Sequence, residues 1–89
     1  MAQIEVVRQN TGIFQVIVTA NTPTVHIVTL TDDYHQKLTG GKVSPEKLIE
    51  KSFDFLLERE SNTSILSHFE LSVIARYFPE YEKVIVTRF

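Results

Sequence analysis

Three histidines are the side chains of this sequence that titrate nearest to neutral pH, so they are the first candidates for acid–base or metal chemistry. His26 lies in an apolar stretch, His35 follows two aspartates, and His68 precedes a phenylalanine. No two histidines have the i, i+4 spacing of a helical metal site, and no His-Glu-x-x-His motif occurs. We therefore expect no metal site. His26 is a candidate binding residue, with a hydrogen-bonded sheet histidine as the alternative.

Asp32 and His35 form the one acid–base pair with helical spacing. They are three residues apart, which places them on the same side of a helix. The two side chains could share a ligand or act as a catalytic pair. The commoner arrangement is a helix cap followed by an exposed histidine, and both interpretations stay open.

Lys42 ends the run Thr39-Gly40-Gly41-Lys42, which superficially resembles a phosphate-binding loop. The motif lacks its first glycine, no Ser or Thr follows the lysine, and the run follows a predicted helix instead of a strand. We expect this run to end one helix and lead into the next, with Lys42 as a candidate binding residue. No cysteine nucleophile and no Gly-x-Ser-x-Gly motif is present, so we expect neither catalytic residues nor a cofactor.

The composition is that of one small globular domain. The chain has 89 residues, of which 43% are hydrophobic and 22% are charged, with a net charge of −2. This charge argues against binding to nucleic acid or to an anionic membrane. The absence of cysteine excludes disulfides and thiolate metal sites. The N-terminal residues do not resemble a signal peptide and no apolar run is long enough to span a bilayer, which predicts a cytoplasmic protein.

The segment 44–60, SPEKLIEKSFDFLLERE, predicts the main helix. Ser44 is a suitable N-cap, and Pro45 suits the first helical position. At 100° per residue, an apolar stripe covers about half of the circumference. A stripe this wide predicts a helix that lies on a sheet, and its members are Leu48, Ile49, Ser52, Phe53, Phe55, Leu56 and Leu57.

Four other segments predict strands and three predict short helices. Residues 2–9, 13–20 and 24–31 alternate or are rich in β-branched residues, and turn residues separate them. We also predict a strand for the last residues, YEKVIVTRF. Short helices are expected at about 32–38, 64–69 and 71–78. The predicted fold class is α+β in a single domain, with a four-stranded antiparallel or mixed sheet covered on one face by helices (β-β-β-α-α-α-β).

A sheet covered on one face leaves a second face to solvent. Val7, Ile13, Ile17 and Ile85 are expected to contribute apolar side chains to that face. Such a surface often binds a partner, commonly a second copy of the chain. We therefore expect self-association or a protein partner at the uncovered sheet face.

Several short runs between residues 38 and 81 resemble a group of short, stand-alone bacterial proteins without assigned function. These runs are L-T-G-G, S-P-E-x-L-I, S-F-x-F-L-L-E-R-E, S-I-L and Y-F-P-E-Y. The resemblance implies a bacterial, free-standing small protein and transfers no catalytic residue.

The sequence favours a small non-enzymatic interaction or accessory protein. The alternative is a ligand-binding or catalytic domain with a pocket between sheet and helices. That alternative gains if His26 and His35 converge on one cavity.

Overall fold

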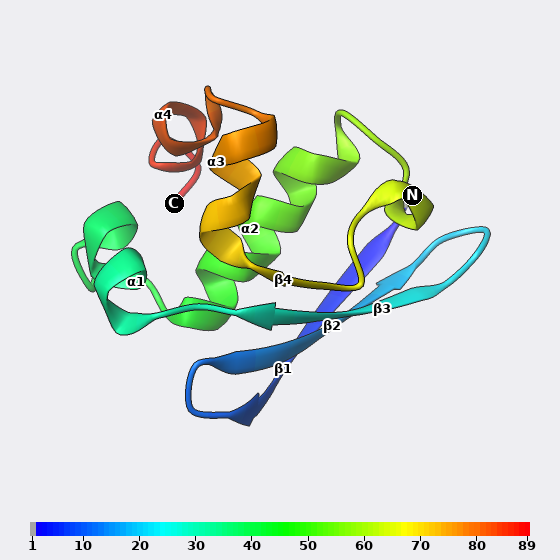
Figure 1. The fold of residues 1–89 in the computed structure, drawn as a ribbon, viewed down its shortest axis with the longest axis horizontal. Helices are drawn as coiled ribbons and strands as arrows, with labels where there is room; N and C mark the ends of the chain where they lie inside the picture. Colours follow the sequence, from blue (N-terminus) through cyan, green and yellow to red (C-terminus); the bar gives the residue numbers. More distant parts are fainter. Residues whose placement is uncertain (1) are drawn as a thin grey trace.

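The computed structural model describes residues 2–89, which form a four-stranded sheet with helices packed against it (Figure 1). The strands are β1 (Gln3–Asn10), β2 (Ile13–Thr19), β3 (Thr24–Thr29) and β4 (His68–Glu70). The helices are α1 (Asp32–Thr39), α2 (Pro45–Leu57), α3 (Ile74–Tyr77) and α4 (Tyr81–Ile85), with 3-10 turns η1 (Asn62–Ser64) and η2 (Leu71–Val73). The predicted fold class, an α+β domain with a four-stranded mixed sheet covered on one face by helices, is confirmed.

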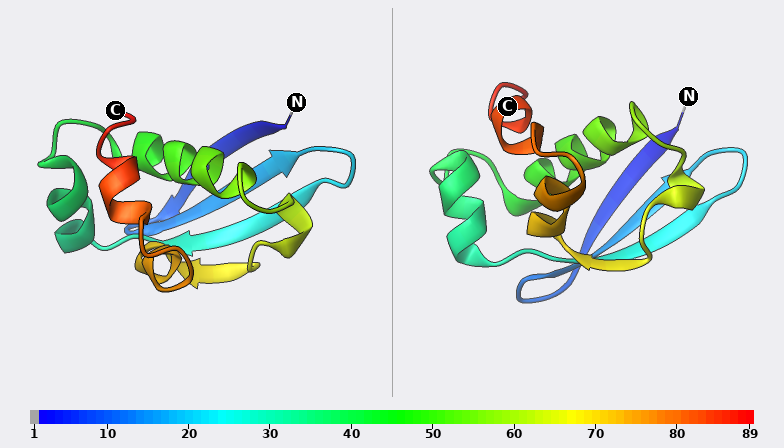
Figure 2. Two further views of the ribbon diagram at one scale, coloured as in Figure 1. Left: turned by 90° about the horizontal axis from the view of Figure 1, so that it is seen from above. Right: turned by 45° about the horizontal axis from the view of Figure 1, so that its top comes forward.

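The strands follow one another across the sheet in the order β1-β2-β3-β4. β1, β2 and β3 form the predicted antiparallel meander, in which Gly12, with a φ of 72°, provides the left-handed residue of the first turn. β4 pairs with β3 in parallel. Figure 2 shows β4 at the edge of the sheet, with α3 close to its end.

The fourth strand is not where the sequence predicted it. The segment 64–69 was expected to be a short helix, but its last residues belong to β4, which begins at His68. β2 occupies one edge of β3, and a segment distant in sequence pairs with the other edge. At this second edge the amide of Ile27 donates a hydrogen bond to the carbonyl oxygen of Ser67 at 2.7 Å. Pairing with β3 therefore outweighs the weak helical pattern of this segment.

The predicted C-terminal strand is also wrong, because residues 81–85 form α4. Their β-branched residues favour a strand, but Tyr81 and Ile85 are both fully buried at the i, i+4 spacing of one helix face. Ile85 therefore belongs to the core and not to the uncovered sheet face. The expected helix at 71–78 is confirmed as η2 followed by α3.

α2 begins as predicted but ends at Leu57 instead of residue 60, and it buries the predicted stripe except for Leu57, which is half-buried. The Ser44 hydroxyl accepts a hydrogen bond from the amide of Lys47 at 3.1 Å, and Pro45 is the first helical residue. The stripe is wide because the helix is covered on two sides. Phe53 packs beside Phe69 of the sheet at 6.0 Å between ring centroids, and Phe55 packs against Tyr81 of α4 at 5.3 Å.

Candidate functional site

His26 is buried on the helix-covered side of β3, and both of its ring nitrogens have hydrogen-bond partners. Nδ1 lies 2.8 Å from the carbonyl oxygen of Leu66, so Nδ1 carries the proton and donates. In the neutral ring, Nε2 then accepts from the hydroxyl of Thr24, also at 2.8 Å. The side-chain amide of Asn62 donates to that same hydroxyl oxygen at 2.8 Å. These hydrogen bonds connect the segment 62–66 to β3. They agree with the alternative interpretation, in which His26 is a hydrogen-bonded histidine of the sheet.

Asp32 and His35 both lie in α1, at the other end of β3. Thr31 caps this helix, and Asp32 is exposed in its first turn. His35 donates from Nε2 to the carbonyl oxygen of Val43 at 2.7 Å. Within residues 2–89, no hydrogen bond or ion pair joins Asp32 to His35. His26 and His35 contact different segments, and neither lines the pocket described below.

Lys42 lies in the exposed connection between α1 and α2. Gly40, with a φ of 63°, ends α1 as predicted, and the Gly41 amide donates to the hydroxyl of Thr39 at 2.9 Å. The loop is therefore a helix end. Anion binding by Lys42 stays a prediction. Among residues 2–89, no group of three His, Asp or Glu side chains is placed to hold a metal ion.

An apolar pocket of about 220 Å³ opens between the end of α2, the segment 64–66, β4 and α3. Leu66 and Tyr77 stand at its rim, with 47% and 67% of their surface exposed. The lining is apolar except for one carboxylate and two hydroxyls, and it consists of Leu56, Glu60, Ser64, Ile65, Leu66, Phe69, Val73, Ile74, Tyr77 and Phe78.

Glu60 is the single charged residue of this lining. Partial burial raises the pKa of its carboxyl above the usual value for glutamate. No hydrogen bond or ion pair reaches this carboxylate from any of the residues 2–89. The pocket therefore offers a carboxylate that no cation of the described chain neutralises.

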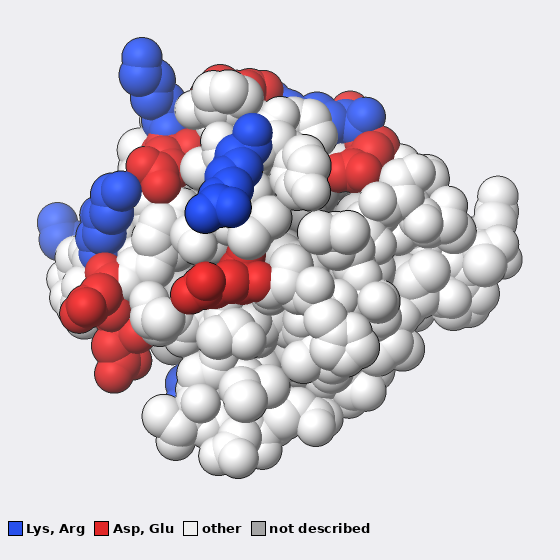
Figure 3. All heavy atoms as spheres, viewed as in Figure 1, with Lys and Arg blue, Asp and Glu red and all other residues white. Residues whose placement is uncertain are grey.

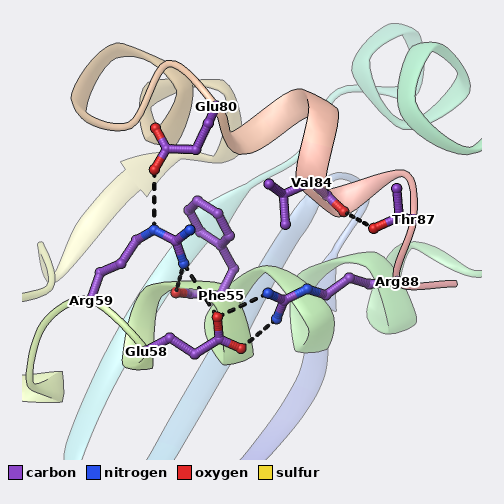
Figure 4. A network of polar contacts seen from close by, with 7 residues as sticks. All are labelled: Phe55, Glu58, Arg59, Glu80, Val84, Thr87 and Arg88. Atoms are coloured by element: carbon purple, nitrogen blue, oxygen red, sulfur yellow. Dashed lines mark hydrogen bonds and ion pairs between the residues drawn. The ribbon is translucent and has the colours of Figure 1, made fainter.

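The guanidinium of the neighbouring residue, Arg59, is bound by other groups of the chain (Figure 4). The Arg59 guanidinium lies 3.6 Å from the centroid of the Phe55 ring, and its Nε pairs with Glu80 at 3.2 Å. A second nitrogen donates to the Phe55 carbonyl oxygen at 3.2 Å and pairs with Glu58 at 3.3 Å. Arg59 therefore stabilises the contact between α2 and the C-terminal segment.

The pocket was not predicted, although one signal for it exists in the sequence. Glu60 stands seven residues after Phe53, so at 100° per residue it continues the apolar stripe instead of the charged face. A carboxylate in that position indicates a partly buried charge. The other walls come from β4 and α3, whose contact with α2 depends on the tertiary fold.

A second candidate surface is the face of the sheet opposite the helices, which no element covers in Figure 1. From Gln9 to Thr31 the chain contains no Lys, Arg, Asp or Glu, and this stretch forms β2 and β3. Val7, Ile13 and Val25 are exposed on the open face, Val25 to 50%. The register places on this face Gln3, Glu5, Val7, Ile13, Gln15, Ile17, Thr19, Val25, Ile27, Thr29 and, from β4, His68 and Glu70.

In the view of Figure 3 the charged side chains gather over the upper and left parts of the molecule. The surface over the segment 61–67 and over the β2–β3 turn is uncharged, in agreement with the sequence of both segments. None of the helices within residues 2–89 has the length and hydropathy needed to cross a bilayer.

Comparison of the chain with protein-family models, with curated proteins and with solved structures found no match.

Proposed function

We propose that the protein is a non-enzymatic interaction module that associates with a second copy of itself through the open face of its sheet. The observation that carries this proposal is the uncharged stretch from Gln9 to Thr31, which supplies the two inner strands of that face. Val25 and Ile13 expose apolar side chains there, and their burial against another apolar surface is favourable.

A second copy fits this face better than a charged partner does. β2 and β3 carry no Lys, Arg, Asp or Glu, and His26 of β3 is buried on the other side, so these strands offer no charge complementarity to a strongly charged surface. Two sheets can pack face to face about 10 Å apart with their apolar side chains interdigitated. A twofold axis uses the same apolar patch on both subunits, as in most homodimers.

The size of the face predicts weak association. β2 has 7 residues, and with four strands the face measures roughly 400 Å² per subunit. A standard interface buries about 800 Å² per partner. We therefore expect a reversible dimer that dissociates in roughly the micromolar range or above.

The hydrogen bonds of His26 support a structural role in place of a catalytic one. Both ring nitrogens are engaged by groups of the protein, and the ring packs 5.4 Å from that of Phe53. A catalytic domain built on His26 and His35 is therefore the weaker candidate.

A cytoplasmic role in bacteria is also part of the proposal. The resemblance of residues 38–81 to short bacterial proteins supports the bacterial origin. Immunoblotting of fractionated bacterial cells tests this location, and recovery of the protein from a membrane or extracellular fraction would contradict it.

Light scattering over a range of concentrations tests the dimer. The mean mass should rise from 10.2 kDa towards twice that mass between about 1 μM and about 1 mM protein. A mass that stays at 10.2 kDa throughout would overturn the proposal.

A further inference from the structure

We propose that the pocket between α2, β4 and α3 binds an extended peptide of a partner protein, which inserts one bulky apolar side chain and places a neighbouring lysine or arginine at Glu60. This site lies on the helix-covered side of the sheet. It is independent of the proposed dimer, because Phe69 and Leu56 belong to the core side and Val25 to the open face.

The size of the pocket favours a side chain over a free small molecule. Its volume of about 220 Å³ is below the ~300–1,000 Å³ of typical small-molecule sites. Ile74, Phe69 and Leu56 provide an apolar wall for one aromatic or branched aliphatic group. Peptide recognition commonly relies on such single anchor residues.

The rim also favours a ligand that extends beyond the pocket. Leu66 and Tyr77 are exposed to 47% and 67% at its mouth. A ligand confined to the pocket leaves most of this apolar surface in water, whereas a peptide chain passing across the rim covers it. Exposed tyrosine is also a frequent contact residue in protein interfaces.

The charge at the pocket selects a cation. The Glu60 carboxylate is partly desolvated, and no basic side chain of residues 2–89 pairs with it. The adjacent Arg59 is held by Glu80 and Glu58. A lysine or arginine placed here gains a charge-assisted hydrogen bond to the Glu60 carboxylate.

The edge of the sheet offers a place for the peptide backbone. β4 lines the pocket through Phe69 and pairs only with β3, so one side of its backbone is outside the ladder. An extended peptide can add a strand to such an edge and direct alternate side chains to one face. β4 has only 3 residues, so the anchor side chain must provide most of the specificity.

Selection from a display library of random short linear peptides tests the proposal with the full chain as bait. Enriched peptides should share a bulky apolar residue within two positions of Lys or Arg. Their affinity, measured by fluorescence anisotropy, should fall about five- to tenfold when the basic residue is replaced by glutamine. The same loss is expected for the wild-type peptide on Glu60→Gln, and a loss of similar or greater size on Leu66→Ser.

Glu50→Gln is the matched control variant. Glu50 lies on the same helix and pairs with Lys47 at 3.4 Å on the charged side of α2, remote from the pocket lining. Peptide affinity should be unchanged in this variant. No enrichment, a consensus without a basic residue, or affinities equal on wild type, Glu60→Gln and Leu66→Ser would each overturn the proposal. The glutamine-substituted peptide tests the charge on the wild-type protein even if a variant fails to fold.

Discussion

His26 donates a hydrogen bond from Nδ1 to the carbonyl oxygen of Leu66, 40 residues further along the chain and 2.8 Å away. Leu66 is also a rim residue of the apolar pocket. A buried side chain of β3 therefore fixes the position of the segment that forms one wall of the pocket. The most conspicuous candidate for chemistry in the sequence therefore holds one wall of the pocket in place.

Replacement of His26 by alanine should destabilise the protein by about 2–4 kcal/mol. The variant leaves the Leu66 carbonyl without its donor and the Thr24 hydroxyl without its acceptor, and it removes a ring packed against Phe53. Urea unfolding measures this change. His68→Ala is the control, because His68 is exposed and its ring nitrogen makes a long hydrogen bond of 3.4 Å to the hydroxyl of Ser67. Equal stability of the two variants would contradict the role given to His26.

Replacement of Phe53 by alanine should cost about 3–5 kcal/mol, because the ring is fully buried between sheet and helix. A domain of this size has a total stability of only ~4–13 kcal/mol, so little folded protein should remain at 37 °C. Thermal unfolding followed by circular dichroism measures the effect. Val86→Ala, at a residue 47% exposed, should leave the melting temperature nearly unchanged. A melting temperature within a few degrees of wild type for Phe53→Ala would contradict the packing.

The bond between Tyr34 and Glu82 should make stability depend on pH. The Tyr34 hydroxyl donates to Glu82 at 2.7 Å and is the main cause that lowers the pKa of this carboxyl in the folded state. A lowered folded-state pKa stabilises the protein above the unfolded-state pKa of 4.5, and the contribution is lost as the pH falls through the folded-state value.

Tyr34→Phe should therefore be less stable than wild type at neutral pH, and the difference should shrink below about pH 4. Urea unfolding of both proteins across this pH range checks the prediction. Tyr77→Phe is the control, since Tyr77 is 67% exposed and lines the pocket, whose lining does not include Glu82. A stability difference for Tyr34→Phe that stays constant with pH would show that Glu82 is not involved.

The sequence predicted correctly those helices and turns that are determined by residues within one short segment. The serine cap, the proline and the stripe centred on Phe53 are sufficient for α2, and Gly12 is sufficient for the first turn. β4 could not be predicted, because three residues carry little pattern and its partner strand is distant in sequence. Tyr81 and Ile85 show the opposite case, in which burial on one helix face overrides the strand preference of β-branched residues.

Of the two candidate sites, the sequence predicted the open sheet face but not the pocket. The open sheet face was predicted from alternating apolar residues such as Ile13 and Ile17, and the structure adds Val25 and Ile27 to it. The pocket was missed, because its walls come from three elements that only the tertiary fold brings together. Its one local signal is Glu60, a carboxylate on an apolar stripe.

The most direct test of the dimer is sedimentation equilibrium of Val25→Lys beside Val86→Lys. Both substitutions place a lysine at a half-exposed valine, with 50% and 47% of the surface exposed, but Val25 lies on the open sheet face and Val86 follows α4 on the helical side. Wild type and Val86→Lys should show the same concentration-dependent dimer, while Val25→Lys should stay at the monomer mass. Dimerisation of Val25→Lys as strong as that of Val86→Lys would contradict self-association through the sheet.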